Sequence, residues 1–291
     1  MKTKTKRKLV VGAAAGFLAA NVIAGAIFKH IDSKEPPTPT TLTELLKTTP
    51  PDSLTNRIEH DGVEVITQTK VPTTRLRAIA SEVALVRPIL GGQTPIIFFN
   101  TPDFLRRLVI PNASRYEMEY NLTSRNIVAS TGNFAKPESI LIPEMFHEAA
   151  HAVFNDSKNQ DDLKRVFDSA RAKYGAKDTE GHLIFSIFDE THYRDFSPYL
   201  NEPWRFGHPY SKPAELFASA SAVMRHDAPK FIRAMRQIAV EDSARHGLAL
   251  KVARTVLGYY QGHEESIFPK SVLDYVRAKP ESLRVKERER K

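Results

Sequence analysis

Two histidines, His147 and His151, stand four residues apart in the largely apolar stretch 142–154. On a helix of 3.6 residues per turn the two imidazoles lie one above the other, with Glu148 about 100° around the axis. Apolar residues flank this face on both sides, and Pro143 suits a first helical turn. The pattern therefore predicts a helix that is buried in a domain core and yet presents two imidazoles and a carboxylate.

The spacing His147-Glu148-x-x-His151 is the ligand arrangement of a zinc-dependent peptidase. Both imidazoles can reach one Zn²⁺ ion, and three protein ligands leave a fourth position for a water, whose pKa falls to roughly 7. Glu148 can touch that water without binding the ion, so it is the expected general base. A pentapeptide of this form also arises by chance, so the interpretation depends on its helical context.

A third ligand is needed, because two histidines alone hold zinc weakly. The short-spaced solution fails, since Ser157 stands six residues after His151 without the glycine or third histidine of that pattern. The best placed downstream acid is Glu215, near the start of a helix predicted over 211–224 with Pro213 in its first turn. A solvated carboxylate at a helix N-terminus is the alternative interpretation of Glu215. Three other acids remain rival ligands: Asp189, Glu190 and Glu202.

Taken together, His147, Glu148 and His151, followed by Glu215 in Glu-x-Phe-Ala-x-Ala, resemble the gluzincin metallopeptidases. The likeness is greatest to the branch that contains anthrax lethal factor and the bacterial Pro-Pro endopeptidases, and it covers under a quarter of the chain. It implies a zincin-like α+β domain that binds one Zn²⁺ ion through the two histidines and the distant glutamate.

Two positions depart from the pattern of that branch. The tyrosine that stabilises the oxyanion there, seven residues before the glutamate ligand, is His208 here, with Tyr210 two residues later. Either side chain can donate a hydrogen bond to an oxyanion, so both are candidate catalytic residues. Many gluzincins have an aspartate one turn after the glutamate, where it orients a zinc histidine, but this chain has Ser219. The orienting group is therefore expected elsewhere, or the affinity for zinc is expected to be lower.

The N-terminal residues predict an exported protein. Five basic residues lie within 1–8 and precede an uncharged run, 9–28, whose twenty residues are long enough to cross a bilayer core. The basic cluster predicts a cytoplasmic N-terminus and an extracytoplasmic catalytic domain on a single membrane span. A cleaved signal peptide that yields a secreted domain is the alternative. Gly12 and Gly16 have the small-xxx-small spacing that favours weak self-association of such a helix.

Composition limits the remaining partners. The chain has 291 residues, no cysteine and a net charge of +8. The lack of cysteine excludes disulfides and thiolate ligands. Most of the net positive charge lies at the two ends, so the nearly neutral body predicts no nucleic-acid partner. After the apolar run, the predicted units are a linker rich in proline and threonine (29–52), a metallopeptidase domain (53–280) and a charged tail (281–291).

Local patterns predict the elements of that domain. A hairpin is expected over 57–67 around Asp61-Gly62, and strand 126–130 is the candidate cleft rim that pairs with substrate, with an ordinary internal strand as the alternative. Further strands are predicted at 95–100 and 116–120, with a loop over 181–209. The other predicted helices are 73–87, 102–109, 161–174, 228–240, 243–259 and 271–278.

The sequence thus predicts an α+β fold in which a small mixed sheet and the active-site helix form one lobe and further helices form a C-terminal lobe, behind an N-terminal transmembrane helix. The predicted function is that of a zinc metalloendopeptidase acting on a peptide or protein substrate. The alternative is a membrane-tethered, zincin-like binding module with weak or no catalytic activity.

Overall fold

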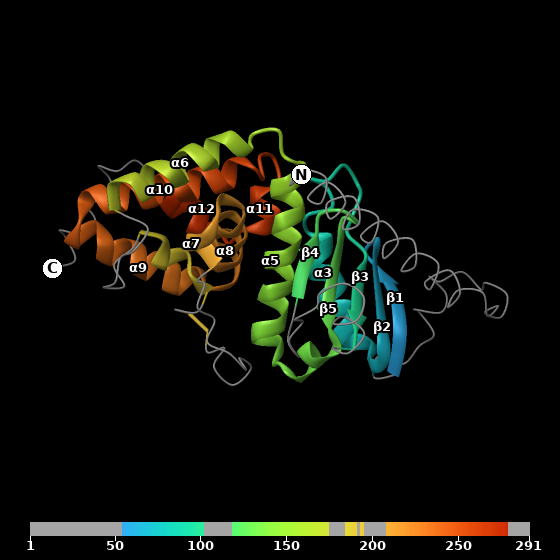
Figure 1. Cartoon of the computed structure of the whole chain (residues 1–291). Helices are drawn as coiled ribbons and strands as arrows, with labels where there is room; N and C mark the ends of the chain where they lie inside the picture. Colours follow the sequence, from blue (N-terminus) through green and yellow to red (C-terminus); the bar gives the residue numbers. More distant parts are fainter. Residues whose placement is uncertain (1–53, 102–117, 175–183, 191–192, 195–207, 279–291) are drawn as a thin grey trace, which may run out of the picture.

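The computed structural model describes residues 54–101, 118–174, 184–190, 193–194 and 208–278 (Figure 1). Within these ranges, no helix combines the length and apolarity that crossing a bilayer requires. Several predicted segments lie outside the described residues, namely the N-terminal units 1–8, 9–28 and 29–52, the helix at 102–109, most of the loop 181–209 and the tail 281–291.

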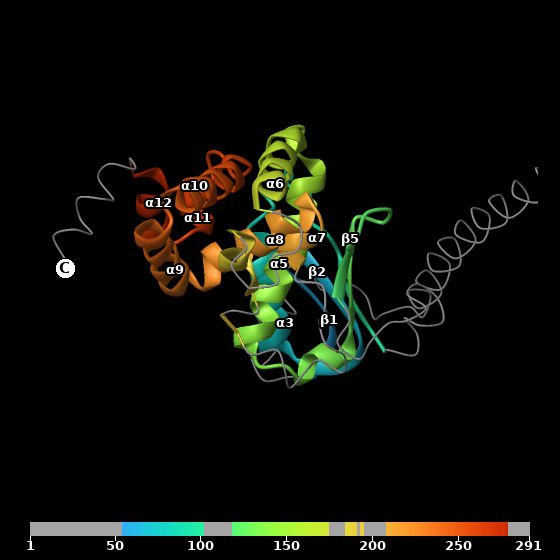
Figure 2. The same cartoon turned by 60° about the vertical axis from the view of Figure 1, so that its left-hand side comes forward.

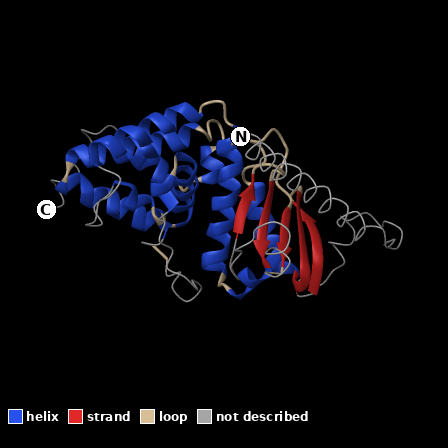
Figure 3. Cartoon of the chain, in the orientation of Figure 1, coloured by secondary structure: helices blue, strands red, loops and turns tan. Residues whose placement is uncertain are grey.

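A mixed sheet forms the N-terminal lobe of the described fold (Figure 3). Within the described residues, its strand order is β1-β2-β3-β5-β4. β1 and β2 form the predicted hairpin around Asp61-Gly62, where both residues have positive φ, as a two-residue turn requires. β3 is parallel to β2 and β5, whereas β4 is antiparallel to β5. The strands are β1 (Leu54–His60), β2 (Val63–Pro72), β3 (Ile97–Asn100), β4 (Met118–Asn121) and β5 (Asn126–Ser130).

The position of β5 contradicts the prediction that Asn126–Ser130 is the rim strand. β5 pairs with β3 on one side and β4 on the other, so among the described strands the edge position belongs to β4. The burial agrees with this order, because Ile127 and Ala129 are fully buried whereas all of β4 is half-buried. A strand enclosed on both sides carries a continuous apolar run, and a strand at an edge need not.

Two helices pack with the sheet. α3 (Thr73–Ala84) contacts β1, β2 and α5, and α5 (Glu138–Asp156) also contacts β4. α3 ends three residues before its predicted end at Arg87, and its buried face carries Leu76, Ile79 and Val83. Figure 1 places the sheet on one side of α5 and the C-terminal helices on the other, and in Figure 2 α9, α10 and α12 lie on the side of α5 away from β1 and β5, while α8 overlaps α5. α5 therefore lies between the two lobes and packs against both.

α5 begins earlier than its sequence suggests. Its first residue is Glu138, so Pro143 lies inside the helix rather than in its first turn. A proline there has no N–H to donate to the carbonyl four residues before it, which normally argues for a helix start. Burial offsets the loss, because Ile140 and Leu141, in the added turn, belong to the buried core of the protein. The helix therefore continues through Pro143 with one backbone hydrogen bond missing.

The C-terminal lobe consists of helices close to their predicted ranges. Asp242 caps α10, since its Oδ1 accepts hydrogen bonds from the backbone N–H groups of Ala244 and Arg245. The long helices are α6 (Gln160–Tyr174), α8 (Pro213–His226), α9 (Ala228–Glu241), α10 (Ser243–Gly258) and α12 (Lys270–Arg277). Its short helices are η2 (Ile184–Phe188), α7 (His208–Ser211) and α11 (Glu264–Ile267), whereas η1 (Thr131–Ala135) lies between β5 and α5 in the chain and contacts β2 of the sheet.

α8 packs directly on α5 and holds the two lobes together. It starts at Pro213 with Lys212 as its N-cap, whereas Ser211, predicted as part of its start, instead ends α7. The fully buried Phe217 stands in an aromatic cluster, with ring centroids 5.5 Å from Phe154 of α5 and 5.6 Å from Tyr260. This apolar contact fixes how α8 lies against α5.

A polar cluster joins the lobes at the C-terminal end of α8. The buried carboxylate of Glu82, on α3, accepts hydrogen bonds from Arg225 and pairs with His226 Nε2 at 2.9 Å. Burial disfavours the charged form, but the hydrogen bonds and charge interactions with His226 and Arg225 outweigh it and lower the pKa of Glu82 below its usual value. α8 is therefore tied to the sheet lobe by charge at this end, in addition to the aromatic packing.

Candidate metal centre

α5 presents the histidines and Glu148 together. His147 and Glu148 are buried, and the ring centroids of His147 and His151 lie 4.9 Å apart. The helix provides this spacing because residues four apart stand one turn above each other on the same face. The apolar residues on either side of that face, including Phe146 and Ala150, are fully buried and fix the rotation of the helix.

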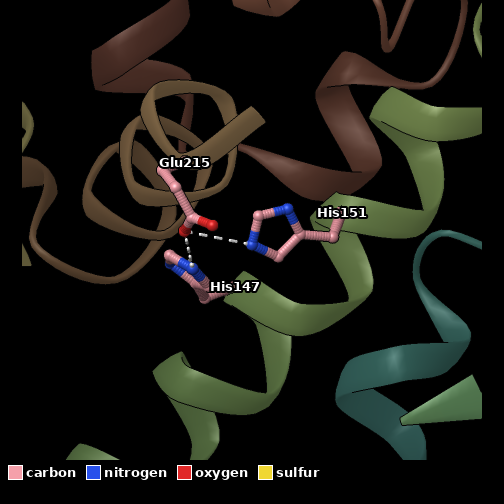
Figure 4. Close-up of side chains that lie close together, drawn as sticks. All are labelled: His147, His151 and Glu215. Atoms are coloured by element: carbon pink, nitrogen blue, oxygen red, sulfur yellow. Dashed lines mark ion pairs between the residues drawn. The ribbon is translucent and has the colours of Figure 1, made fainter. Parts of the chain in front are cut away.

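α8 brings Glu215 to the same place. Figure 4 shows its carboxylate turned toward both imidazole rings, with Oε2 at 3.5 Å from His147 Nε2 and 3.3 Å from His151 Nε2. One ligand atom from each of the three residues lies within 4.8 Å of the others. Residues that are far apart in the sequence thus converge on one point between α5 and α8.

These distances can be tested against the size of a metal ion. Nitrogen and oxygen ligands at roughly 2.0–2.2 Å from a tetrahedral Zn²⁺ ion stand about 3.3 Å from one another. The separations of Glu215 Oε2 from the two histidine nitrogens, 3.5 and 3.3 Å, are close to that value. Two imidazoles and one carboxylate are also donors that zinc accepts, and three ligands leave a fourth position open. With the two histidine nitrogens at most 4.8 Å apart, the three residues form a donor set that could hold a single zinc ion.

Glu148 is held by the edge strand. Its Oε2 accepts a hydrogen bond of 2.6 Å from the backbone N–H of Tyr120, on β4. Burial raises the pKa of Glu148 to about 8, with the positive charge of a protonated His147 and the Tyr120 N–H opposing the rise and the carboxylate of Glu215 adding to it. A carboxylate with a raised pKa and one oxygen fixed in direction suits a group that takes up and releases a proton near neutral pH.

The second nitrogen of His147 contacts one of the rival acids. His147 Nδ1 lies 2.6 Å from Glu190 Oε1, so Glu190 lies on the opposite side of the ring from Glu215. Burial disfavours the charged imidazolium, but the Glu190 carboxylate outweighs it and holds the pKa of His147 well above its usual value. A carboxylate on the outer nitrogen fixes the tautomer and orientation of a metal-binding histidine. Glu190 is therefore placed to orient His147, and it is not in the group of three ligand atoms found among the described residues.

The other two rivals do not join the group. Asp189 is buried but is not part of the cluster of three ligand atoms found among the described residues, and Glu202 lies outside those residues. Ser219, expected as a weak orienting group, is fully buried, and its Oγ has no hydrogen-bond partner within the described part of the chain. The orienting carboxylate comes instead from the residues that follow η2, a source for which the sequence offered no signal beyond the acidic pair itself.

Two lysines form ion pairs with acidic residues of the site. Lys136 Nζ lies 2.7 Å from both oxygens of Glu144, one turn before Glu148 on α5. Burial raises the pKa of Glu144, and Lys136 opposes that rise. Lys212 Nζ lies 3.4 Å from Glu215 Oε1, the oxygen other than the one that approaches the histidines. The two oxygens of Glu215 therefore have different neighbours, since Oε2 approaches the histidines and Oε1 approaches Lys212.

The candidate oxyanion groups lie on α7. His208 and Tyr210 belong to this short helix, which packs directly against α8, but their side chains lie outside the described part of the structure. The backbone places both residues beside the helix that carries Glu215.

Comparisons with known proteins identified no relative of this chain. No family model matches the chain, and neither a curated protein nor a solved structure matches it. What the protein does must therefore be inferred from the residues of the site.

Proposed function

We propose that this protein is a zinc-dependent metalloendopeptidase of the gluzincin type. The observation that supports it most is the approach of Glu215 Oε2 to the Nε2 atoms of both His147 and His151, at distances close to those between the ligands of one zinc ion. The three residues would bind the ion, and Glu148 beside them would act as the general base.

Each residue has a distinct part in the proposed hydrolysis. A bound zinc ion would supply the Lewis acidity that polarises the substrate carbonyl and makes water nucleophilic at neutral pH. Glu148 removes the proton from the attacking water through the oxygen that Tyr120 leaves available, and later gives that proton to the leaving amine nitrogen. His208 or Tyr210 donates a hydrogen bond to the oxyanion that forms on the substrate.

The edge strand suggests how a peptide would be held. The Tyr120 N–H bonds to Glu148 and is therefore turned away from β5, and in an antiparallel strand the backbone groups two residues along share that direction. Met118 would thus direct its backbone N–H and carbonyl toward the open side, where an extended substrate can add as a further strand. This role was expected of Asn126–Ser130 and passes to Met118–Asn121.

The sequence motivates the proposed location. The basic residues 1–8 and the apolar run 9–28 support a single-pass membrane protein with an extracytoplasmic catalytic domain, or a secreted one after signal cleavage. The proposal includes no nucleic-acid partner, because the body of the chain is nearly neutral.

Three variants of the full chain in detergent test the proposal by metal content and by cleavage of a mixed peptide library followed by mass spectrometry. Glu148→Gln should retain zinc and lose hydrolysis, whereas Glu215→Ala should lose zinc. Glu138→Gln is the matched control, because it makes the same change at an exposed position of the same helix, and it should change neither. Hydrolysis by Glu148→Gln at the rate of the unaltered protein would refute the mechanism. Absence of both zinc and hydrolysis in the unaltered protein would favour a zincin-like binding module.

A further inference from the structure

Arg194 lies between two buried carboxylates behind the metal centre. Its Nη1 donates a hydrogen bond of 2.6 Å to Glu190 Oε2, and its Nε and Nη2 donate bonds of 2.8 and 2.6 Å to Asp227 Oδ2. The side chains of all three residues are at most 11% exposed. The guanidinium is planar and rigid, so two hydrogen bonds to one acid fix the direction of the third donor toward the other.

These contacts extend to a candidate ligand. Glu190 Oε2 accepts from Arg194 while Glu190 Oε1 lies 2.6 Å from His147 Nδ1, so the carboxylate is held at both oxygens. A continuous row of contacts runs from Asp227 through Arg194 and Glu190 to His147. The imidazole can turn about its side-chain bonds only by breaking a bond to a carboxylate that is itself fixed.

The far end of the row is attached to the other ligand helix. Asp227 directly follows α8, its N–H donates to the carbonyl of Val223, and its own carbonyl accepts the N–H of Phe231 in α9. α8 carries Glu215 near its start. The position and angle of α8 are thus transmitted both to Glu215 and, through Asp227, to His147.

α8 offers no other acid that could orient His147. Glu215 is the only acidic residue in its sequence, and the buried Ser219, one turn later, makes no hydrogen bond within the described residues. The orienting charge must come from another segment, and a carboxylate on an irregular segment needs its own support. Arg194 and Asp227 supply that support.

We propose that Arg194, anchored by Asp227, is a positioning residue that aims Glu190 at His147 and thereby sets the affinity of the site for zinc. This inference depends on the metal site of the proposed function. It assigns to the pair a role that requires no contact with zinc or with substrate, and it predicts that their loss weakens metal binding even though every ligand remains.

The test measures the zinc dissociation constant of the full chain by competition with a fluorescent chelator. Glu190→Gln should weaken zinc binding about 10- to 100-fold, as losses of orienting partners do, and Arg194→Gln and Asp227→Asn should weaken it about tenfold. Arg194→Lys should fall between Arg194→Gln and the unaltered protein, because an ammonium restores the charge but cannot bridge both acids with the same fork.

The control uses a second cluster of the same chemistry. Glu82, paired with Arg225 and His226, is an equally buried carboxylate held by an arginine and a histidine, but it lies outside the metal-ligand group. Glu82→Gln should lower the free energy of unfolding of the metal-free protein and leave the zinc dissociation constant unchanged within about twofold. The unfolding measurement on each variant separates damage to the fold from loss of ligand orientation.

Two results would contradict the positioning role of Arg194 and Asp227. Zinc affinities of Arg194→Gln and Asp227→Asn that match the unaltered protein would overturn the positioning role, as would an equal loss in Glu82→Gln. If the Arg194 variants do not fold, Asp227→Asn, which keeps the shape of the side chain, decides alone. Failure of the unaltered protein to bind zinc would instead refute the metal site itself, and the proposed function with it.

Discussion

The hydrogen bond between the edge strand and Glu148, the proposed general base, can be removed without changing Glu148 itself. Tyr120→Pro deletes the N–H that donates to Glu148 Oε2, whereas Tyr120→Ala keeps the N–H and removes the same aromatic ring. Proline is tolerated at edge strands where the N–H does not enter the ladder, and Tyr120 meets that condition. The comparison between the two variants therefore isolates one backbone donor.

The size of the effect follows from the kind of bond. A hydrogen bond to a charged, buried carboxylate contributes about 1.5–3 kcal/mol, so kcat/KM of the proline variant should be about 10- to 150-fold below that of the alanine variant. The assay is initial-rate cleavage of one peptide recovered from the library, at saturating zinc, with zinc content measured on the same samples. Equal kcat/KM for the two variants at equal zinc content would show that the Tyr120 N–H does not support Glu148 in hydrolysis.

Two further predictions concern the metal-free protein. Because burial raises the pKa of Glu148 from 4.5 to about 8, the folded state binds a proton that the unfolded state releases, and stability should fall as pH rises from about 4.5 to 8 and level off above. Denaturant titrations should show this loss relative to Glu148→Gln, with a slope of at most about 1.4 kcal/mol per pH unit, and pH-independent differences would contradict it. Phe217→Ala should lower the free energy of unfolding by about 3–5 kcal/mol because it empties the aromatic contact between α5 and α8, and a loss below about 1 kcal/mol would mean that this contact does not hold the lobes.

Most helices and strands could be predicted because their signals are local. The hairpin at Asp61-Gly62 needs two residues with positive φ, and an Asp-Gly pair favours that conformation. α9 and α10 follow from apolar spacing, and Asp242 marks the start of α10 with its own side chain. The start of α5 was missed because Pro143 looked like a first-turn residue, and only the burial of Ile140 and Leu141 shows why the helix continues through it.

The prediction that Asn126–Ser130 lies at the edge of the sheet was wrong for a different reason. Strand order is a property of pairing between distant segments, and β5 inserts between β3 and β4 although β4 precedes it in the chain. A signal was nevertheless available: Ile127, Val128 and Ala129 form an unbroken apolar run, as enclosed strands do, while β4 alternates with polar residues.

In the candidate site too, some residues could be predicted from local sequence signals and others could not. His147, Glu148 and His151 share one helix, so periodicity alone places them together, and Glu215 followed from the resemblance and the helix around it. Glu190 was considered only as a ligand, because its pairing with the outer nitrogen of His147 depends on the path of an irregular segment. Arg194 and the Tyr120 N–H were not found at all, since a guanidinium behind a site and a backbone donor leave no pattern in a sequence.

The division of the proposed ligands between α5 and α8 would have a consequence for the lifetime of the protein. A metal held by side chains from two packed helices is also a cross-link between them, and only the folded state can form it. Free zinc at 100 times its dissociation constant would add about 2.7 kcal/mol to the free energy of unfolding. The zinc supply of the compartment where the domain resides would then set how long each molecule resists unfolding and degradation, independently of how many substrates it cleaves.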